Sequence, residues 1–158
     1  MRYSDGDYEA VHSSPVWQDR ANFILAAHLG TKDGRNEWEQ LWGEEVGPNR
    51  YVLCCIPFFA YDIALGDEVE TDSNSTIEKV VRRSGQVTFR IWLGGTTPEN
   101  CQNLVSEVEA AGALLECSSE NLLALSVSER HAQKIANILQ QHEESGHLQY
   151  ETGVSVKR

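Results

Sequence analysis

The spacing of hydrophobic and polar residues changes once along the chain, near residue 87. Before this point, apolar residues recur at period two and include many β-branched and aromatic side chains, a pattern typical of β-strands. Glycine, aspartate, asparagine and serine separate the runs, as turns require. The sequence therefore predicts a strongly curved sheet or small barrel. Its strands are expected over residues 21–29, 38–46, 51–56, 76–83 and 87–93, and the first of these also fits a short helix.

After residue 87, strand and helix patterns alternate. Thr97, Pro98 and Glu99 suit the N-cap, the first position and the acidic first turn of a helix, and Ser128 suits the cap of a second. Each helix has an apolar face at a spacing of three to four residues. The two faces consist of Cys101, Leu104, Val105 and Val108, and of Ala132, Ile135, Ile138 and Leu139. With strands over residues 88–93, 113–117, 122–127 and 147–152, the order is β-α-β-β-α-β, a ferredoxin-like split βαβ arrangement.

These patterns predict an α+β protein in three parts. Residues 1–20 are polar and rich in turn formers, so we expect a loose N-terminal lead-in. Residues 21–86 form the β-rich, barrel-like module, and residues 87–153 form the ferredoxin-like half. A chain of 158 residues can bury a core without metal ions or disulfide bonds.

The compartment is indicated by the absence of several signals. The sequence contains no run of 18 apolar residues and starts without an apolar segment, so we expect neither a membrane span nor a signal peptide. Its four cysteines, Cys54, Cys55, Cys101 and Cys117, form no CxxC pair. Without a secretion signal, we expect reduced, packed thiols and a cytoplasmic location.

The charge balance is strongly acidic. Asp and Glu number 24 against 13 Lys and Arg, which gives a net charge of −11, and the excess is spread along the whole chain. Such a field repels nucleic acid and anionic lipid and attracts basic partners. The alternative is that the acidity serves only solubility. We expect a basic protein partner, with no nucleic acid and no membrane.

Several short motifs resemble a known family. They are Ile56-Pro57-Phe58-Phe59-Ala60, Leu65-Gly66-Asp67-Glu68-Val69, Val80-Val81-Arg82-Arg83-Ser84-Gly85, Thr88-Phe89-Arg90 and the upstream Glu39-Gln40-Leu41-Trp42. Together they resemble domain-of-unknown-function family 4265, small bacterial proteins with no agreed activity. The resemblance covers residues 21–150. The family pattern carries a His-Ser pair after Ser-Gly, where this chain has Gln86 and Val87. The resemblance therefore implies a fold more than an activity.

The residue types that usually carry catalysis are poorly arranged for it. His142 and His147 lie five residues apart with Gly146 between them, whereas a helical zinc motif needs a spacing of four. His12, His28 and His131 have no evident partners in the sequence, and we expect them to be exposed. Ser84 lacks the glycine that would complete a nucleophile elbow. Cys101 lies in a first helical turn but on the apolar face, where burial opposes thiolate formation. We therefore expect no metal, no cofactor and no enzyme activity.

The basic residues of the central region raise a second possibility. Arg82 and Arg83 point to opposite faces of a strand, so only one of them can join Arg90 on one side. Asp67 is the expected counter-ion for these arginines. We interpret Asp67, Arg83 and Arg90 as an ion pair that fixes the sheet register, or else as a ligand site.

Three functional hypotheses follow. The first is an immunity or antitoxin-type inhibitor that binds a basic toxin, such as a nuclease domain, because exposed aromatic and acidic residues suit such an interface. Its expected binding residues are Trp42, Glu44, Glu45, Tyr61, Asp62, Glu68, Glu70 and Asp72. The second is a regulatory module that binds a small ligand around Asp67, Arg83 and Arg90. The third is an enzyme that works through Ser84, Thr88 and Arg90.

Overall fold

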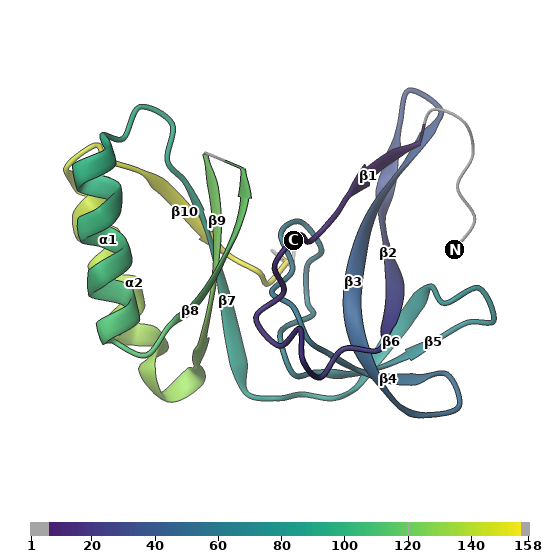
Figure 1. Cartoon of the computed structure of the whole chain (residues 1–158). Helices are drawn as coiled ribbons and strands as arrows, with labels where there is room; N and C mark the ends of the chain where they lie inside the picture. The colour runs from purple at the N-terminus through teal and green to yellow at the C-terminus, as the bar shows by residue number, and fades with distance from the viewer. Residues whose placement is uncertain (1–6, 120, 156–158) are drawn as a thin grey trace.

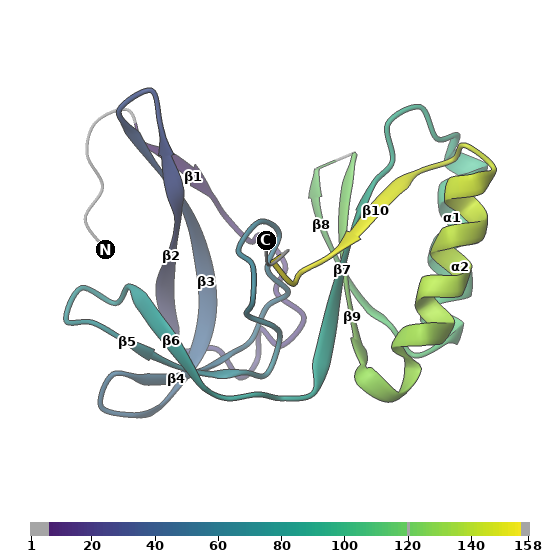
Figure 2. The same ribbon diagram turned by 180° about the vertical axis from the view of Figure 1, so that it is seen from behind.

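Two β-sheets face each other across an irregular segment, and two α-helices cover the outer face of the second sheet (Figures 1 and 2). The computed structural model describes residues 7–119 and 121–155. The protein is α+β with β-structure dominant, as the sequence predicts. In the described ranges, no helix is long and apolar enough to cross a membrane.

The first sheet is organised around its longest strand, β3. It contains β1 (Tyr8–Ala10), β2 (Phe23–Lys32), β3 (Arg35–Gly47), β4 (Arg50–Leu53), β5 (Glu68–Thr71) and β6 (Ile77–Arg82). β2 pairs along one edge of β3, while β1 and β4 share the other edge, β1 in parallel and β4 antiparallel. Residues 21–29 therefore contribute to a strand and not to a helix.

The sheet curves so that its last strand approaches β2. The Ala26 N–H donates to the Ser75 carbonyl over 3.0 Å, and Ala26 and Thr76 form a parallel bridge. The period-two alternation explains which side chains turn inward. Leu25, Leu41, Leu53 and Val69 are fully buried on the concave side.

The second sheet has the strand order β10-β7-β9-β8 and is antiparallel throughout. Its strands are β7 (Gln86–Trp92), β8 (Leu114–Ser119), β9 (Leu122–Ser128) and β10 (Gln149–Thr152). The helices are α1 (Pro98–Ala110) and α2 (Ala132–Glu144), and the latter follows a 3₁₀ turn at Glu129–His131. The predicted cap of α1 is confirmed, because Thr97 accepts a hydrogen bond from the Asn100 N–H. Ser128 caps the 3₁₀ turn, since it accepts from the Arg130 N–H, whereas α2 begins after His131, which makes no side-chain capping hydrogen bond.

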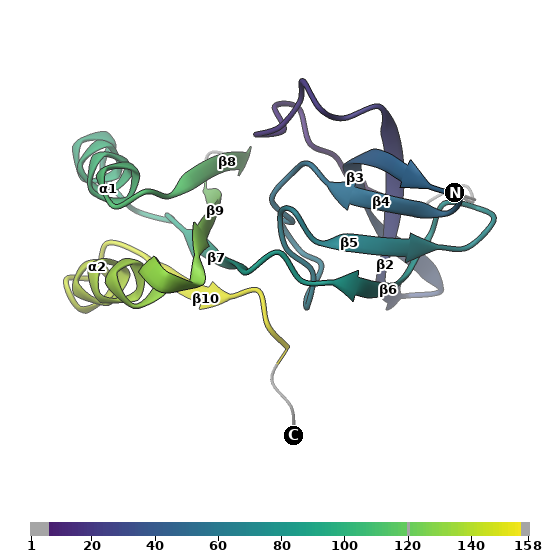
Figure 3. The ribbon, with the colours of Figure 1, turned by 90° about the horizontal axis from the view of Figure 1, so that it is seen from below.

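The two faces of the second sheet have different partners. Phe89, Ile91 and Leu125 face the helices and pack on Leu104 and Ile135. On the opposite face, Leu122 and Ala124 of β9 pack on Ile56, Phe58 and Leu65. These last residues belong to an irregular segment, residues 54–67, that lies between the sheets (Figure 3). The predicted strand over residues 51–56 is therefore too long, since β4 ends at Leu53 before Pro57.

The N-terminal lead-in also differs from the prediction. Residues 1–6 lie outside the described part of the chain. Residues Tyr8–Ala10, however, form β1, and Ala10 and His12 are buried. The Trp17 N–H donates to the Cys54 carbonyl over 3.0 Å. This part of the chain is thus not loose, because it crosses between the two sheets and is hydrogen-bonded to both of them.

The cap of α1 gives a direct test of this description. Thr97→Ala removes the side-chain acceptor of the Asn100 N–H and should lower the free energy of unfolding by about 1 kcal/mol. Ser106→Ala, at an exposed position inside the same helix, is the control and should cost nothing. Denaturant titrations of both variants would measure the difference, and equal stabilities would contradict the capping assignment.

Candidate functional site

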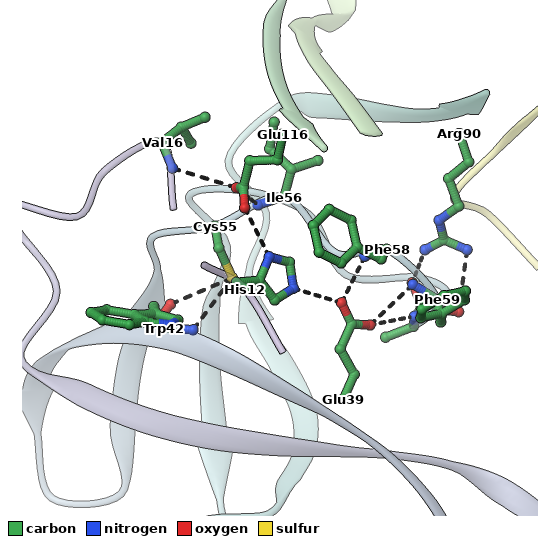
Figure 4. Close-up of polar contacts among 11 residues, drawn as sticks. His12, Val16, Glu39, Trp42, Cys55, Ile56, Phe58, Phe59, Arg90 and Glu116 are labelled. Atoms are coloured by element: carbon green, nitrogen blue, oxygen red, sulfur yellow. Dashed lines mark hydrogen bonds and ion pairs between the residues drawn. The ribbon is translucent and has the colours of Figure 1, made fainter. Parts of the chain in front are cut away.

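A buried histidine, His12, lies between the carboxylates of Glu39 and Glu116 (Figure 4). The Nε2 of His12 is 2.7 Å from Glu39 Oε2, and its Nδ1 is 2.8 Å from Glu116 Oε1. The three side chains expose 0%, 0% and 2% of their surface. They come from the N-terminal segment, from β3 and from β8, so the group joins three distant parts of the chain.

The same carboxylates hold the irregular segment between the sheets. Glu39 accepts hydrogen bonds from the backbone N–H groups of Phe58, Phe59 and Ala60 at 2.7, 3.1 and 2.9 Å. Glu116 accepts from the Ile56 N–H at 2.6 Å and from the Val16 N–H at 3.4 Å. Backbone groups without a strand partner are thus satisfied by buried side chains, as a buried loop requires.

Electrostatics favours the charged form of this group. Burial disfavours protonation of His12, but its hydrogen bonds to Glu116 and Glu39 outweigh burial and raise the pKa of the imidazole. Burial likewise disfavours the Glu39 carboxylate. The hydrogen bond and charge of His12, together with the Phe58 and Ala60 N–H groups, nevertheless lower the pKa of Glu39. We therefore assign an imidazolium to His12, stacked 4.0 Å from the Phe58 ring.

Arg90 lies on the other side of the same segment and is 1% exposed. Its Nη1 donates to the Phe59 carbonyl over 3.2 Å, and its Nη2 donates to the Ala60 carbonyl. Its guanidinium also lies 3.7 Å from Glu151 and 4.6 Å from the centre of the Tyr61 ring. The N–H groups of Phe59 and Ala60 thus face Glu39 while their carbonyls face Arg90, so the Ile56–Ala60 motif is fixed from both sides.

Asp67 forms a separate buried anchor. Its carboxylate accepts from the N–H groups of Ala64 at 3.0 Å and Ser84 at 2.8 Å, and it lies 3.3 Å from Arg83 Nη1. The preceding Gly66 has a φ of +84°, and a Cβ there would lie 3.0 Å from the Ser84 Cβ. The Gly-Asp step is therefore required by a left-handed turn and a close approach.

The expected grouping of Asp67, Arg83 and Arg90 is therefore only partly present. Asp67 is 1% exposed and pairs with Arg83, whose side chain is 62% exposed. Arg90 contacts the 59–61 segment and Glu151 instead, because it points from β7 toward the irregular segment. The three residues do not form one cluster.

The expected partner-binding residues lie at several places. Glu44 lies on β3 and pairs with Arg20, whereas Glu68 and Glu70 lie on β5 and pair with Arg50 and, for Glu70, also with Lys79. Glu45 lies near the end of β3, and Trp42 is half-buried on β3 opposite Ile24 of β2. Asp72 lies in the turn after β5, and Tyr61 and Asp62 lie in the irregular segment. The acids therefore alternate with bases and do not form one uninterrupted acidic edge.

Comparison with known proteins assigns the family. The model of the domain of unknown function DUF4265 matches residues 39–150. The chain belongs to this family. Its fold is also similar to a hypothetical protein from Neisseria gonorrhoeae at a TM-score of 0.71 and 21% identity, covering 85% of this chain and 96% of that one. No curated protein matches the chain.

The motifs that resemble DUF4265 can now be read structurally. The Glu39 carboxylate accepts hydrogen bonds from backbone N–H groups of the Ile56–Ala60 segment, and the Asp67 carboxylate accepts one from the Ser84 N–H. In this member of DUF4265 the motifs are thus hydrogen-bonding partners. Ser84 is part of the same arrangement, because its hydroxyl donates to the Leu65 carbonyl over 2.7 Å.

Sequence reasoning missed His12 and Glu116. The expectation that His12 is exposed is wrong, since it is 4% exposed, whereas His28 and His131 are exposed as expected. The one available signal was Glu116, an acid within the otherwise apolar residues 113–117. His142 and His147 approach each other at 3.5 Å. Within the described ranges, no three His, Cys, Asp or Glu side chains are grouped to hold a metal ion.

The thiols differ in their surroundings. Cys54 and Cys55 are buried, and burial raises the pKa of both. Cys101, which we expected on the inward face, is only partly buried, and Cys117 is exposed. Burial of its sulfur, with Cys101 and Glu116 nearby, still raises the pKa of Cys117.

Removing the charge of Glu39 should strongly destabilise the fold. Glu39→Gln leaves the His12 imidazolium without one carboxylate and replaces acceptors of three backbone N–H groups. The expected loss in the free energy of unfolding is about 3–5 kcal/mol. Glu44→Gln, which breaks the partly exposed pair with Arg20, is the matched control and should cost less than about 1 kcal/mol. Similar losses for the two variants would show that the buried group is not a main source of stability.

The buried group also sets a pH window for stability. The lowered pKa of Glu39 contributes stability that is present above 4.5, its ordinary value, and lost as pH falls through the folded pKa. The raised pKa of His12 contributes stability that is present below 6.5 and lost as pH rises through the folded pKa. Unfolding free energy should therefore be highest between these pH values. His12→Gln should remove the decline on the alkaline side, and an unchanged decline would contradict the assignment.

Proposed function

We propose that the protein is a non-enzymatic binding module that captures a basic protein partner. The form we favour is an immunity or antitoxin-type inhibitor that occludes a basic toxin, such as a nuclease domain. The supporting observation is the state of the buried titratable groups. His12, Glu39 and Glu116 are inaccessible, and their polar atoms already bind one another and the backbone. This buried charged group thus holds the fold together.

The surface acids support capture of a cationic protein. Glu44, Glu68 and Glu70 are partly exposed and are held in defined positions by bases on neighbouring strands or, for Glu44, by Arg20. An exposed ion pair of this kind contributes only ~0–1 kcal/mol. A lysine or arginine of a partner can therefore replace the internal base at small cost. The net charge of −11 would accelerate the encounter.

The architecture provides a rigid support for such a surface. We infer a small barrel-like module, because β2 approaches β6 through the Ala26–Thr76 bridge. We infer a ferredoxin-like unit for the second part, because its βαββαβ chain has the order β10-β7-β9-β8. We further place the protein in the cytoplasm, where its free thiols would stay reduced.

A second candidate is a regulatory module that binds a small ligand beside Asp67 and Arg83. The observation in its favour is a cavity of about 320 Å³ that both residues line. Arg90 contributes less than the sequence suggested, since it is buried beneath Tyr61. An enzyme that uses Ser84, Thr88 and Arg90 is less well supported, because the Ser84 hydroxyl is bonded to Leu65 and Arg90 has no access to solvent.

Charge reversal tests the proposed capture. The full chain would be used to isolate a partner from its host at low salt, and association rates would then be measured with the purified partner. Glu44→Lys, Glu68→Lys and Glu70→Lys combined should slow association about tenfold or more and flatten its salt dependence. The control reverses Glu99, Glu109 and Glu144, which are exposed on the helices, and has the same net charge. Equal rates for both variants, or a partner that is not basic, would refute the proposal.

A further inference from the structure

The end of helix α2 brings two histidine side chains together. His142 lies in the last turn of α2, and His147 follows the helix directly after Gly146. Their Nδ1 atoms lie 3.5 Å apart, and the ring centres lie 5.7 Å apart with the ring planes at 56°. The spacing of five residues excludes a helical zinc motif only if the helix continues through both histidines. Here the helix ends between them, so a different geometry applies.

The chain leaves α2 through a Schellman motif, which folds it back over the last helical turn. The His147 N–H donates to the His142 carbonyl over 3.0 Å, and the Gly146 N–H donates to the Glu143 carbonyl over 2.9 Å. These two hydrogen bonds define the motif, and Gly146 is its left-handed residue with a φ of +77°. Thr96, in the loop before α1, donates its hydroxyl to the His147 carbonyl. The backbone therefore holds His147 beside His142.

The distance between the two nitrogens fits a shared metal ion better than a hydrogen bond. An N–H donor usually lies ~2.7–3.2 Å from its acceptor, so 3.5 Å is long for a direct bond. Two imidazole nitrogens that each lie ~2.0–2.1 Å from a tetrahedral Zn²⁺ are ~3.3–3.4 Å apart. Adjacent nitrogens of a square-planar site are only ~2.8–3.0 Å apart. The observed separation therefore matches the tetrahedral geometry that zinc prefers.

A carboxylate on the neighbouring helix orients the His142 ring. Helices α1 and α2 lie side by side on the second sheet (Figure 3), and His142 Nε2 lies 3.2 Å from Glu107 Oε1. A carboxylate accepts hydrogen bonds, so in the neutral ring this contact places the proton on Nε2. The lone pair of Nδ1 is then directed toward His147. Histidines that bind metal ions through one nitrogen almost always donate the other N–H to such a partner.

The pair leaves coordination positions open. In the residues that the structure describes, no third His, Cys, Asp or Glu joins the two histidines. The carboxylate of Glu143, beside His142 in sequence, accepts from the Tyr150 N–H over 3.2 Å. Both histidines are partly exposed, so an ion can enter from solvent and water can fill its remaining positions. Structural zinc sites use four protein ligands, and an open site of two binds more weakly.

We propose that His142 and His147 bind a zinc ion through their Nδ1 atoms, with Glu107 as the positioning residue for His142. Imidazole nitrogen is a preferred ligand of zinc. The Schellman motif already holds the two donor atoms near the required separation, so binding orders little of the chain. The inference is independent of the proposed function, because neither histidine belongs to the acidic surface assigned to the partner.

The experiment is a titration of the full chain with zinc ions, followed by NMR of the histidine ring nitrogens. The Nδ1 signals of His142 and His147 should shift together and saturate at one ion per chain, while His142 Nε2 stays protonated. Zinc should also raise the melting temperature, because it binds the folded chain through a preformed pair of ligands. The absence of saturable binding, or ligation through the Nε2 atoms, would overturn the inference.

Variants of the two ligands test the assignment. His142→Gln and His147→Gln should each weaken zinc binding about tenfold or more, because each removes one of two protein ligands. His131→Gln, at an exposed position before α2, is the matched control and should leave the affinity unchanged. Since His147 lies outside the helix, its variant tests the site even where His142→Gln destabilises α2. Wild-type affinity in His147→Gln would overturn the inference.

A variant of Glu107 tests the positioning role. Glu107→Gln should weaken zinc binding about tenfold, within the ~10–100-fold typical of losing the hydrogen-bond partner of a metal ligand. Glu109→Gln, at an exposed position on the same helix, is the control and should bind as the wild type does. Equal affinities for these two variants would contradict the role given to Glu107.

The exposed thiol of Cys117 is the main competing donor for zinc. Cys117→Ser should therefore bind zinc with wild-type affinity and show the same shifts of the two histidine rings. Loss of zinc binding in Cys117→Ser, together with its retention in both histidine variants, would show that the ion binds at the thiol and would overturn the inference.

Discussion

The structure depends on one buried charged group, the His12 imidazolium between Glu39 and Glu116. Each member belongs to a different part of the chain, so the group connects the N-terminal segment, the first sheet and the second sheet at one point. Burying a single charge is costly, and pairing lowers the cost only when every remaining hydrogen-bonding position is filled. Here the Ile56–Ala60 backbone fills those positions on the carboxylates.

This arrangement explains why an irregular segment can lie between two sheets. A buried loop exposes backbone groups that have no strand partner, and each unsatisfied group is destabilising. Glu39 accepts hydrogen bonds from the N–H groups of Phe59 and Ala60, and Arg90 donates to their carbonyl groups. Asp67 accepts from the N–H groups of Ala64 and Ser84. The apolar side chains of the segment are then free to pack on β9. Charged residues thus stabilise the backbone, while hydrophobic burial joins the sheets.

Local patterns in the sequence predicted the helices and strands better than the long-range contacts that join the two sheets. The period-two runs located β3 and β6, and Thr97 with Pro98 located the start of α1, because these features depend on neighbours within a few residues. The contacts of His12 span 27 and 104 residues, and no local pattern encodes such distances. The prediction that Asp67 pairs with an arginine of the central region was correct, and the partner is Arg83. Arg90 is not part of this pair, because it contacts the Phe59 carbonyl in the irregular segment instead. The cavity lined by Asp67 and Arg83 also includes Thr88 and Glu129 from the second part of the chain, and the sequence predicted only a ligand site around Asp67, Arg83 and Arg90.

The most direct test of the central claim is the protonation state of His12 in the folded protein. Its ring nitrogen and carbon chemical shifts can be followed by NMR as the pH is raised, and the spectrum of His12→Gln identifies the signals that belong to His12. The account predicts that His12 remains an imidazolium above 6.5, the ordinary pKa of histidine, because its two carboxylate partners raise its pKa. A neutral His12 ring at or below that pH would contradict it, because the group would then lack the charge that holds the two sheets and their connecting segment together.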